Sequence, residues 1–158
     1  MLTEYNGQIF NAEINGRKVS LWKYVPINGF QKVTTGRGIT YYEKTIAIEE
    51  INDFFSVSFL AFLKDRKFVI TSLDGNNLNV LCDDREYAEA HGFTEMEHGV
   101  WVSRQSIEKF DGFQLIKSIE NCNDKTVLNI SKEQITDLWQ RYVNYPSPKG
   151  NGLVTTQS

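Results

Sequence analysis

The sequence predicts an α+β fold that is mainly antiparallel sheet, with a short acidic helix and a C-terminal amphipathic helix. Aromatic residues make up 13% of the 158 residues and only three residues are proline, which favours pleated sheet. Strand-like segments also alternate with short polar loops, and such loops connect antiparallel neighbours. With 41% hydrophobic and 23% charged residues, the composition excludes a collagen, a coiled coil and a disordered chain.

The order of the elements follows from turn signals between strand patterns. Asn15-Gly16 lies between two such patterns and predicts a hairpin with a type I′ turn. Thr35-Gly36-Arg37-Gly38 predicts a second hairpin, and residues 48–53 either a helical turn or a tight connection. The expected strands are residues 8–14, 17–24, 30–35, 39–48, 54–63, 67–72, 78–82, 93–96, 100–103, 113–119 and 127–130. We expect a single domain over residues 1–146 and a loose tail over 147–158.

Two helices complete the predicted fold. Asp83 is the expected N-cap of the short acidic helix, and Gly92 its expected left-handed end. Ser131 and Gln134 predict a capping box at the start of the C-terminal helix, and Pro146 its end. One apolar stripe follows along that helix at helical spacing: Ile135, Leu138, Trp139, Tyr142 and Val143.

Residues 8–52 and 66–111 resemble each other. The sequence positions differ by 58 at Phe10 and Phe68, by 59 at Gly16 and Gly75, and by 63 at Gly29 and Gly92. The similarity predicts an internal duplication of one strand-rich unit, with the acidic helix inserted in the second copy. Coincidence is the alternative, since strand–turn–strand patterns are repetitive.

The negative charge of the chain is concentrated in one segment. The formal net charge is -3, yet residues 83–97 (DDREYAEAHGFTEME) contain six acidic residues and one basic residue. This segment is either a solvated helix face or a surface that attracts a basic partner. No basic stripe with interleaved aromatic residues is present, so we do not expect nucleic acid as a ligand.

No arrangement of residues in the sequence predicts catalysis. Cys82, Cys122, His91 and His98 have no metal-site spacing, and we expect two reduced thiols and no metal or cofactor. His91 is expected to close the short helix and His98 to lie in a turn. The N-terminus lacks a signal-peptide pattern, and the longest apolar run, residues 54–63, is too short for a membrane span. We therefore expect a cytoplasmic protein that does not contact the membrane.

The order of motifs from Phe54 to Phe110 resembles a family of bacterial proteins. An aromatic strand is followed by KFVIT, a turn with Asp-Gly, NVLC, DDREYAEAHGF and a strand that ends WVSRQSIEKF. This order is similar to immunity proteins of polymorphic toxin systems, especially Bacillus-type ones paired with wall-associated YD-repeat or LXG toxins. The resemblance implies a non-enzymatic antitoxin in the cytoplasm, which occludes the active site of a cognate toxin domain, often a nuclease, in a one-to-one complex.

Charge alone selects the residues expected to meet such a toxin. Nuclease domains have basic grooves, so acidic side chains can take the place of the phosphates. The expected partner-binding residues are Asp83, Asp84, Glu86, Glu89, Glu95 and Glu97. Two alternatives stay open: an enzyme of unrecognised type that uses Cys82, His91 or His98, and a module that binds a small ligand.

Overall fold

The computed structural model describes residues 1–143. It confirms the predicted fold class, a mainly antiparallel sheet with one short and one C-terminal helix. The predicted helix end at Pro146 and the predicted tail over residues 147–158 lie outside the described residues.

The chain divides into two compact units. Unit 1 comprises Met1–Ser56, Ser118–Lys125 and the residues from Trp139 on, and unit 2 comprises Val57–Lys117 and Thr126–Leu138. Grouping by contacts does not test whether the units fold separately, so the single domain over residues 1–146 stays a prediction.

Eleven of the described strands agree closely with the sequence patterns that predict them, whereas the sequence analysis missed the first strand, β1. The described strands are β1 (Leu2–Tyr5), β2 (Gln8–Asn15), β3 (Lys18–Lys23), β4 (Gln31–Thr34), β5 (Thr40–Ala47), β6 (Phe54–Leu63), β7 (Arg66–Asp74), β8 (Asn77–Cys82), β9 (Thr94–Glu97), β10 (Val100–Ser106), β11 (Gly112–Ile119) and β12 (Lys125–Ile130). Strand β6 pairs with β1 and β7, and β11 pairs with β6 and β12. The first three residues of β6 belong to unit 1 and the others to unit 2.

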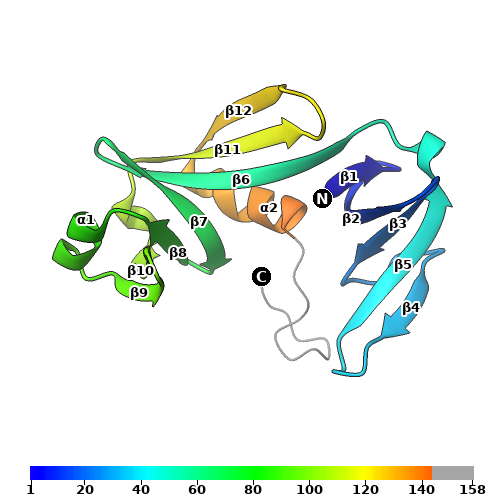
Figure 1. Ribbon diagram of the computed structural model, residues 1–158, viewed down its shortest axis with the longest axis horizontal. Helices are drawn as coiled ribbons and strands as arrows, with labels where there is room; N and C mark the ends of the chain where they lie inside the picture. Colours follow the sequence, from blue (N-terminus) through cyan, green and yellow to red (C-terminus); the bar gives the residue numbers. More distant parts are fainter. Residues whose placement is uncertain (144–158) are drawn as a thin grey trace. The chain divides into compact units, whose positions relative to one another are not determined.

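Unit 1 contains an N-terminal motif, residues 2–50, with the strand order β4-β5-β3-β2-β1 (Figure 1). The predicted hairpin between β2 and β3 is confirmed, but its type I′ turn around Asn15-Gly16 is wrong. Asn15 pairs with Lys18, so Gly16 and Arg17 form the turn, and of these two only Gly16 has a positive φ, 64°. A type I′ turn needs a positive φ at both central residues. The predicted helical turn is confirmed as the 3₁₀ helix η1 (Ile48–Glu50).

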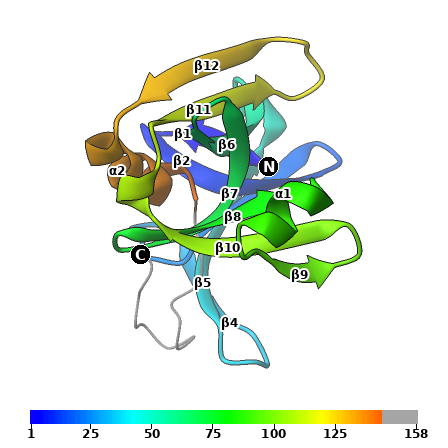
Figure 2. The same cartoon turned by 90° about the vertical axis from the view of Figure 1, so that its left-hand side faces the viewer.

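Unit 2 contains a C-terminal motif, residues 60–109, in which β7, β8, β10 and β9 are neighbours in that order (Figure 2). The helix α1 (Arg85–Ala90) lies between β8 and β9 in the chain, and the 3₁₀ helix η2 (Ile107–Lys109) follows β10. The β6–β7–β8 meander is antiparallel, as predicted.

The two motifs share their strand pairing and their long-range hydrogen bonds. In the N-terminal motif the amide of Ile48 donates to the carbonyl of Arg17 in the hairpin turn at 3.0 Å. In the C-terminal motif the amide of Ile107 donates to the carbonyl of Asn76 at 2.8 Å. In each motif, this bond joins the start of the 3₁₀ helix to the second residue of a hairpin turn. The turn is the one between β2 and β3 in the N-terminal motif and the one between β7 and β8 in the C-terminal motif.

A β-bulge in the C-terminal motif explains why the difference in residue number between the two motifs rises from 58 to 59 along the chain. Asp74 pairs with Asn77 as Asn15 pairs with Lys18, but Thr71 opposes no residue of β8 because the register shifts between Ile70 and Ser72. Strand β2 has no such shift. The extra residue in β7 is therefore Thr71.

The same aromatic pairing recurs in both motifs. Phe10 stacks on Phe30 with ring centroids 5.1 Å apart, and Phe68 stacks on Phe93 with centroids 5.9 Å apart. Phe10 and Phe68 are both almost fully buried, at 2% and 3% exposure. These shared features support the duplication, which itself stays a prediction about the origin of the chain.

The predicted helices form, with one correction at a cap. Asp84, and not Asp83, caps α1, because its side chain accepts the amide of Tyr87 at 3.2 Å. Gly92 ends the helix as predicted, with φ 76°, and the amide of Phe93 donates to the carbonyl of Ala88.

The helix α2 (Lys132–Tyr142) buries part of the predicted apolar stripe, with Ile135 0% and Trp139 5% exposed, and the other three stripe residues are half-buried. One bond of the predicted capping box is present, from the amide of Ser131 to Gln134 Oε1 at 2.9 Å, while the amide of Gln134 donates to the Ser131 carbonyl. The ring of Tyr142 lies edge-on to that of Phe55, another residue of unit 1.

Deletion of Thr71 tests the explanation of the bulge. Loss of this residue removes the bulge and leaves Phe68 and Ile70 facing the core, so we expect a folded protein that loses less than about 2 kcal/mol of unfolding free energy. Deletion of Glu13 from β2 is the control, because β2 has no extra residue and its buried residues would turn outward. Urea denaturation followed by circular dichroism compares the two. Equal losses for both deletions would contradict the assignment.

Candidate functional site

The six predicted partner-binding residues all lie in unit 2, on α1, on β9 and just before α1. We call this set the acidic surface. Asp83, Glu86, Glu89, Glu95 and Glu97 are exposed, and Asp84 is partly buried. The side chains of the set nevertheless differ in how far they are neutralised.

Asp84 has a structural role within unit 2. It caps α1 through the amide of Tyr87, and its Oδ2 pairs with Arg66 Nη1 at 3.2 Å. The Tyr87 amide is the main cause that lowers the pKa of Asp84, and Arg66 lowers it further. We therefore regard Asp84 as the anchor of α1.

Two further acidic side chains have partners of their own. Glu89 Oε2 lies 3.3 Å from Arg85 Nε, one helical turn earlier in α1. Glu95 Oε2 accepts the amide of Gly99 at 3.4 Å in the turn between β9 and β10. Exposed ion pairs of this kind contribute little to stability, and the pair with Arg85 reduces the negative field at Glu89.

The other three carboxylates are unneutralised. Within residues 1–143, Asp83, Glu86 and Glu97 have no ion-pair or hydrogen-bonding partner for their side chains. Three exposed carboxylates on one short segment give the acidic surface its uncompensated negative charge.

Strand β9 presents part of this surface at a sheet edge. Within the described residues it is the last strand of its path and pairs with β10 alone. Glu95 and Glu97 face Trp101 and Val100 in the register, so Met96 between them opposes no residue and is 57% exposed. Charged residues and bulges on edge strands also prevent unwanted strand pairing, which is the alternative role for these glutamates.

The structure also brings together a group that the sequence analysis missed. The Arg66 guanidinium lies 4.1 Å from the ring centroid of Tyr87, and the His91 ring stacks on Tyr87 at 3.8 Å. Two planar groups so close to one centroid cannot share a face, so Tyr87 lies between them. Arg66, Tyr87 and His91 line a hollow of about 580 Å³ together with Lys64 and Lys109, which we call the basic hollow. No sequence signal joins these residues, because they come from three separate segments.

The residues of the enzyme alternative do not form a catalytic pair. Cys82 is buried, and its Sγ donates to the carbonyl of Asp84 at 3.4 Å. His91 closes α1 as predicted, with its Nδ1 2.8 Å from the carbonyl oxygen of Tyr87, and His98 lies in the predicted turn. In the described part of the chain, no hydrogen bond joins Cys82 to either histidine, and no group of three metal-ligating side chains occurs.

Comparison with known protein families, with curated protein sequences and with solved structures gives no match. The resemblance to immunity proteins therefore stays a hypothesis. Among residues 1–143, neither helix is long and apolar enough to cross a bilayer.

Replacement of Asp84 by Asn tests its role as the anchor of α1. Asn caps helices as well as Asp does, so the substitution removes the charge and keeps the cap. Because the folded-state pKa lies below the unfolded value of about 3.9, the carboxylate stabilises the fold above about pH 4, and this contribution is lost as the pH falls through the folded-state pKa. We expect the melting temperature of Asp84→Asn to lie below that of the wild type at pH 7 and to approach it below pH 4.

Asp83→Asn is the control for this measurement, since its carboxylate has no partner within residues 1–143. It should follow the wild type at every pH. A deficit of Asp84→Asn that is the same at pH 3 and pH 7 would show that the charge of Asp84 contributes nothing.

Proposed function

We propose that this chain is an immunity protein, which binds a cognate toxin domain one-to-one in the cytoplasm and blocks its active site. The toxin is expected to be a nuclease. The observation that carries the proposal is the set of unneutralised carboxylates, Asp83, Glu86 and Glu97, held exposed just before α1, on α1 and on β9.

The physical basis is electrostatic complementarity. A nuclease groove is lined with cations that bind phosphates, and carboxylates can occupy those positions without being cleaved. Clustered charge of one sign also attracts an oppositely charged partner before contact, which raises the association rate. Charge on a short helix and an edge strand can enter a groove more readily than charge on a flat sheet face.

The contact area must extend beyond the carboxylates. Stable protein complexes bury about 1,200–2,000 Å² in total and contain an apolar centre within a polar rim. Met96 supplies an exposed apolar side chain between Glu95 and Glu97. We therefore place the centre of the interface at β9, with α1 beside it.

Charge reversal tests the proposal, with the C-terminal toxin domain encoded beside the gene as partner. Glu86→Lys combined with Glu97→Lys should slow association about tenfold at low salt and flatten its dependence on salt, because the attraction before contact is lost. Stopped-flow fluorescence measures both effects, and circular dichroism checks the fold.

The matched control reverses two exposed glutamates of unit 1, Glu13→Lys with Glu120→Lys, which change the total charge equally. We expect a much smaller effect. Equal slowing by both variants would remove the acidic surface from the proposal, and no complex with the toxin domain would overturn the immunity function itself.

A further inference from the structure

The basic hollow of unit 2 combines cations with a defined concave shape. It is lined by Lys64, Arg66 and Lys109 against one carboxylate, Asp65, in a chain whose net charge is -3. Its volume of about 580 Å³ lies in the range of small-molecule sites. An excess of positive charge in a concave site is what an anionic ligand requires.

Arg66 is oriented before any ligand arrives. Asp84 holds its Nη1 at 3.2 Å, and the Tyr87 ring supports the guanidinium at 4.1 Å. A side chain fixed in this way loses less entropy on binding. Lys64 and Lys109 form no ion pair within the described residues. The Lys109 ammonium donates to the neutral Gln105 side chain at 2.9 Å, and the Lys64 amide, not its ammonium, donates to a carboxylate, that of Asp111, at 2.6 Å.

The N-terminal motif shows that the fold does not need these cations. Its turn between β1 and β2 matches the turn between β6 and β7, since Tyr5 pairs with Gln8 as Leu63 pairs with Arg66. The residues at the equivalent positions of Lys64, Arg66 and Lys109 are Asn6, Gln8 and Glu50. The same turn, strand and 3₁₀ helix therefore form with two neutral residues and one acid.

Lys64 is also an unfavourable choice for its backbone. Its φ is 56°, and Asn6 at the equivalent position has φ 51°. Asn adopts this left-handed region several times more readily than most residues, whereas lysine is strained there. The lysine thus has a cost to folding that a neutral turn residue would avoid, which favours a role for its charge.

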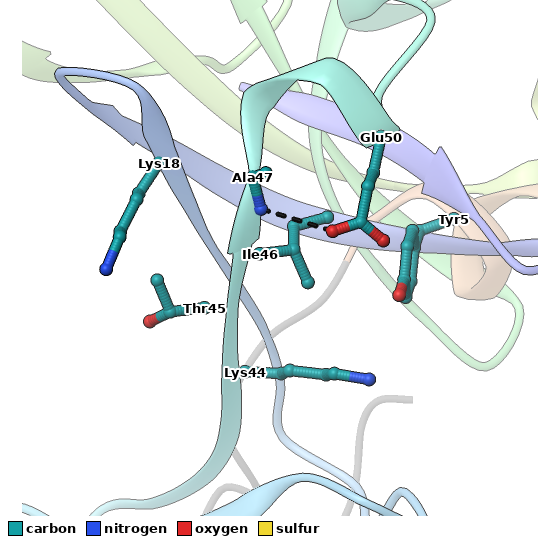
Figure 3. A pocket seen from close by; sticks show the side chains of 7 residues that line it. All are labelled: Tyr5, Lys18, Lys44, Thr45, Ile46, Ala47 and Glu50. Atoms are coloured by element: carbon teal, nitrogen blue, oxygen red, sulfur yellow. Dashed lines mark hydrogen bonds between the residues drawn. The ribbon is translucent and has the colours of Figure 1, made fainter.

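A hollow in unit 1 shares two equivalent lining positions with the basic hollow. It is lined by Tyr5, Lys18, Lys44 and Glu50 among others, and Figure 3 shows Glu50 turned back onto the amide of Ala47 at 3.2 Å. Tyr5 is equivalent to Leu63, and Glu50 is equivalent to Lys109. The 3₁₀ helix therefore contributes an acidic residue to the hollow of unit 1 and a basic residue to the basic hollow of unit 2.

We propose that the basic hollow binds a small molecule that bears a phosphate group. Two lysines without ion pairs can approach the double negative charge of a phosphate, and an oriented arginine can donate two parallel hydrogen bonds to its oxygens. A ligand with a single carboxylate instead of a phosphate would neutralise only one of the two lysines. This inference does not depend on the proposed immunity function.

Isothermal titration of the full chain with inorganic pyrophosphate and with adenosine monophosphate tests the proposal. We expect saturable one-to-one binding of at least one probe. Tighter binding of adenosine monophosphate would show that the organic part contributes, and tighter binding of pyrophosphate that the phosphate groups suffice; both support the site. Binding of neither probe, or equal binding of sulfate, would overturn it.

Two lysine substitutions locate the binding. Lys64→Asn should weaken it about tenfold, the cost of removing one partner of a charge pair. Lys18→Asn is the matched control, because it removes the same charge from the hollow of unit 1 and introduces the residue found at the equivalent position, Asn77. Lys109→Gln is a second, independent variant. Equal weakening by Lys64→Asn and Lys18→Asn would show diffuse attraction and contradict the proposal.

Discussion

The ion pair between Arg66 and Asp84 positions both candidate sites of unit 2. Asp84 caps α1 and accepts from Arg66 at 3.2 Å, so the start of the helix is tied to the start of β7. The same arginine lies on the ring of Tyr87, one turn into the helix. This contact therefore joins the start of α1, next to its exposed carboxylates, to the arginine of the basic hollow.

A comparison of the two motifs separates what the fold requires from what it does not. The buried positions correspond in character: Val19 and Leu78 are nearly inaccessible to solvent, as are Leu21 and Val80. The charged positions around the hollows do not correspond. Since one strand frame forms with both sets of charges, the strands do not require the lysines of the basic hollow.

Local signals made most of the fold predictable, and long-range contacts made the site unpredictable. Strand alternation, the capping bond at Ser131 and the left-handed Gly92 all depend on neighbouring residues, and each is observed. The sequence shows that the difference in residue number between the two motifs changes, and the structure shows the cause of this change, the bulge at Thr71. The aspartate that caps α1, Asp84, also accepts from Arg66, eighteen residues away, and no local pattern contains that contact.

Contacts that the sequence does not reveal also explain why the uncompensated charge of residues 83–97 is smaller than the number of acidic residues there. Six acidic residues predicted one uniform surface, yet Asp84 and Glu89 are paired with arginines, and Glu95 binds a turn amide. Opposite charges therefore lie within one unit, with cations in a hollow and free carboxylates on α1 and β9. A partner that approaches α1 and β9 meets a negative surface, while a small anion that reaches the hollow meets a positive one.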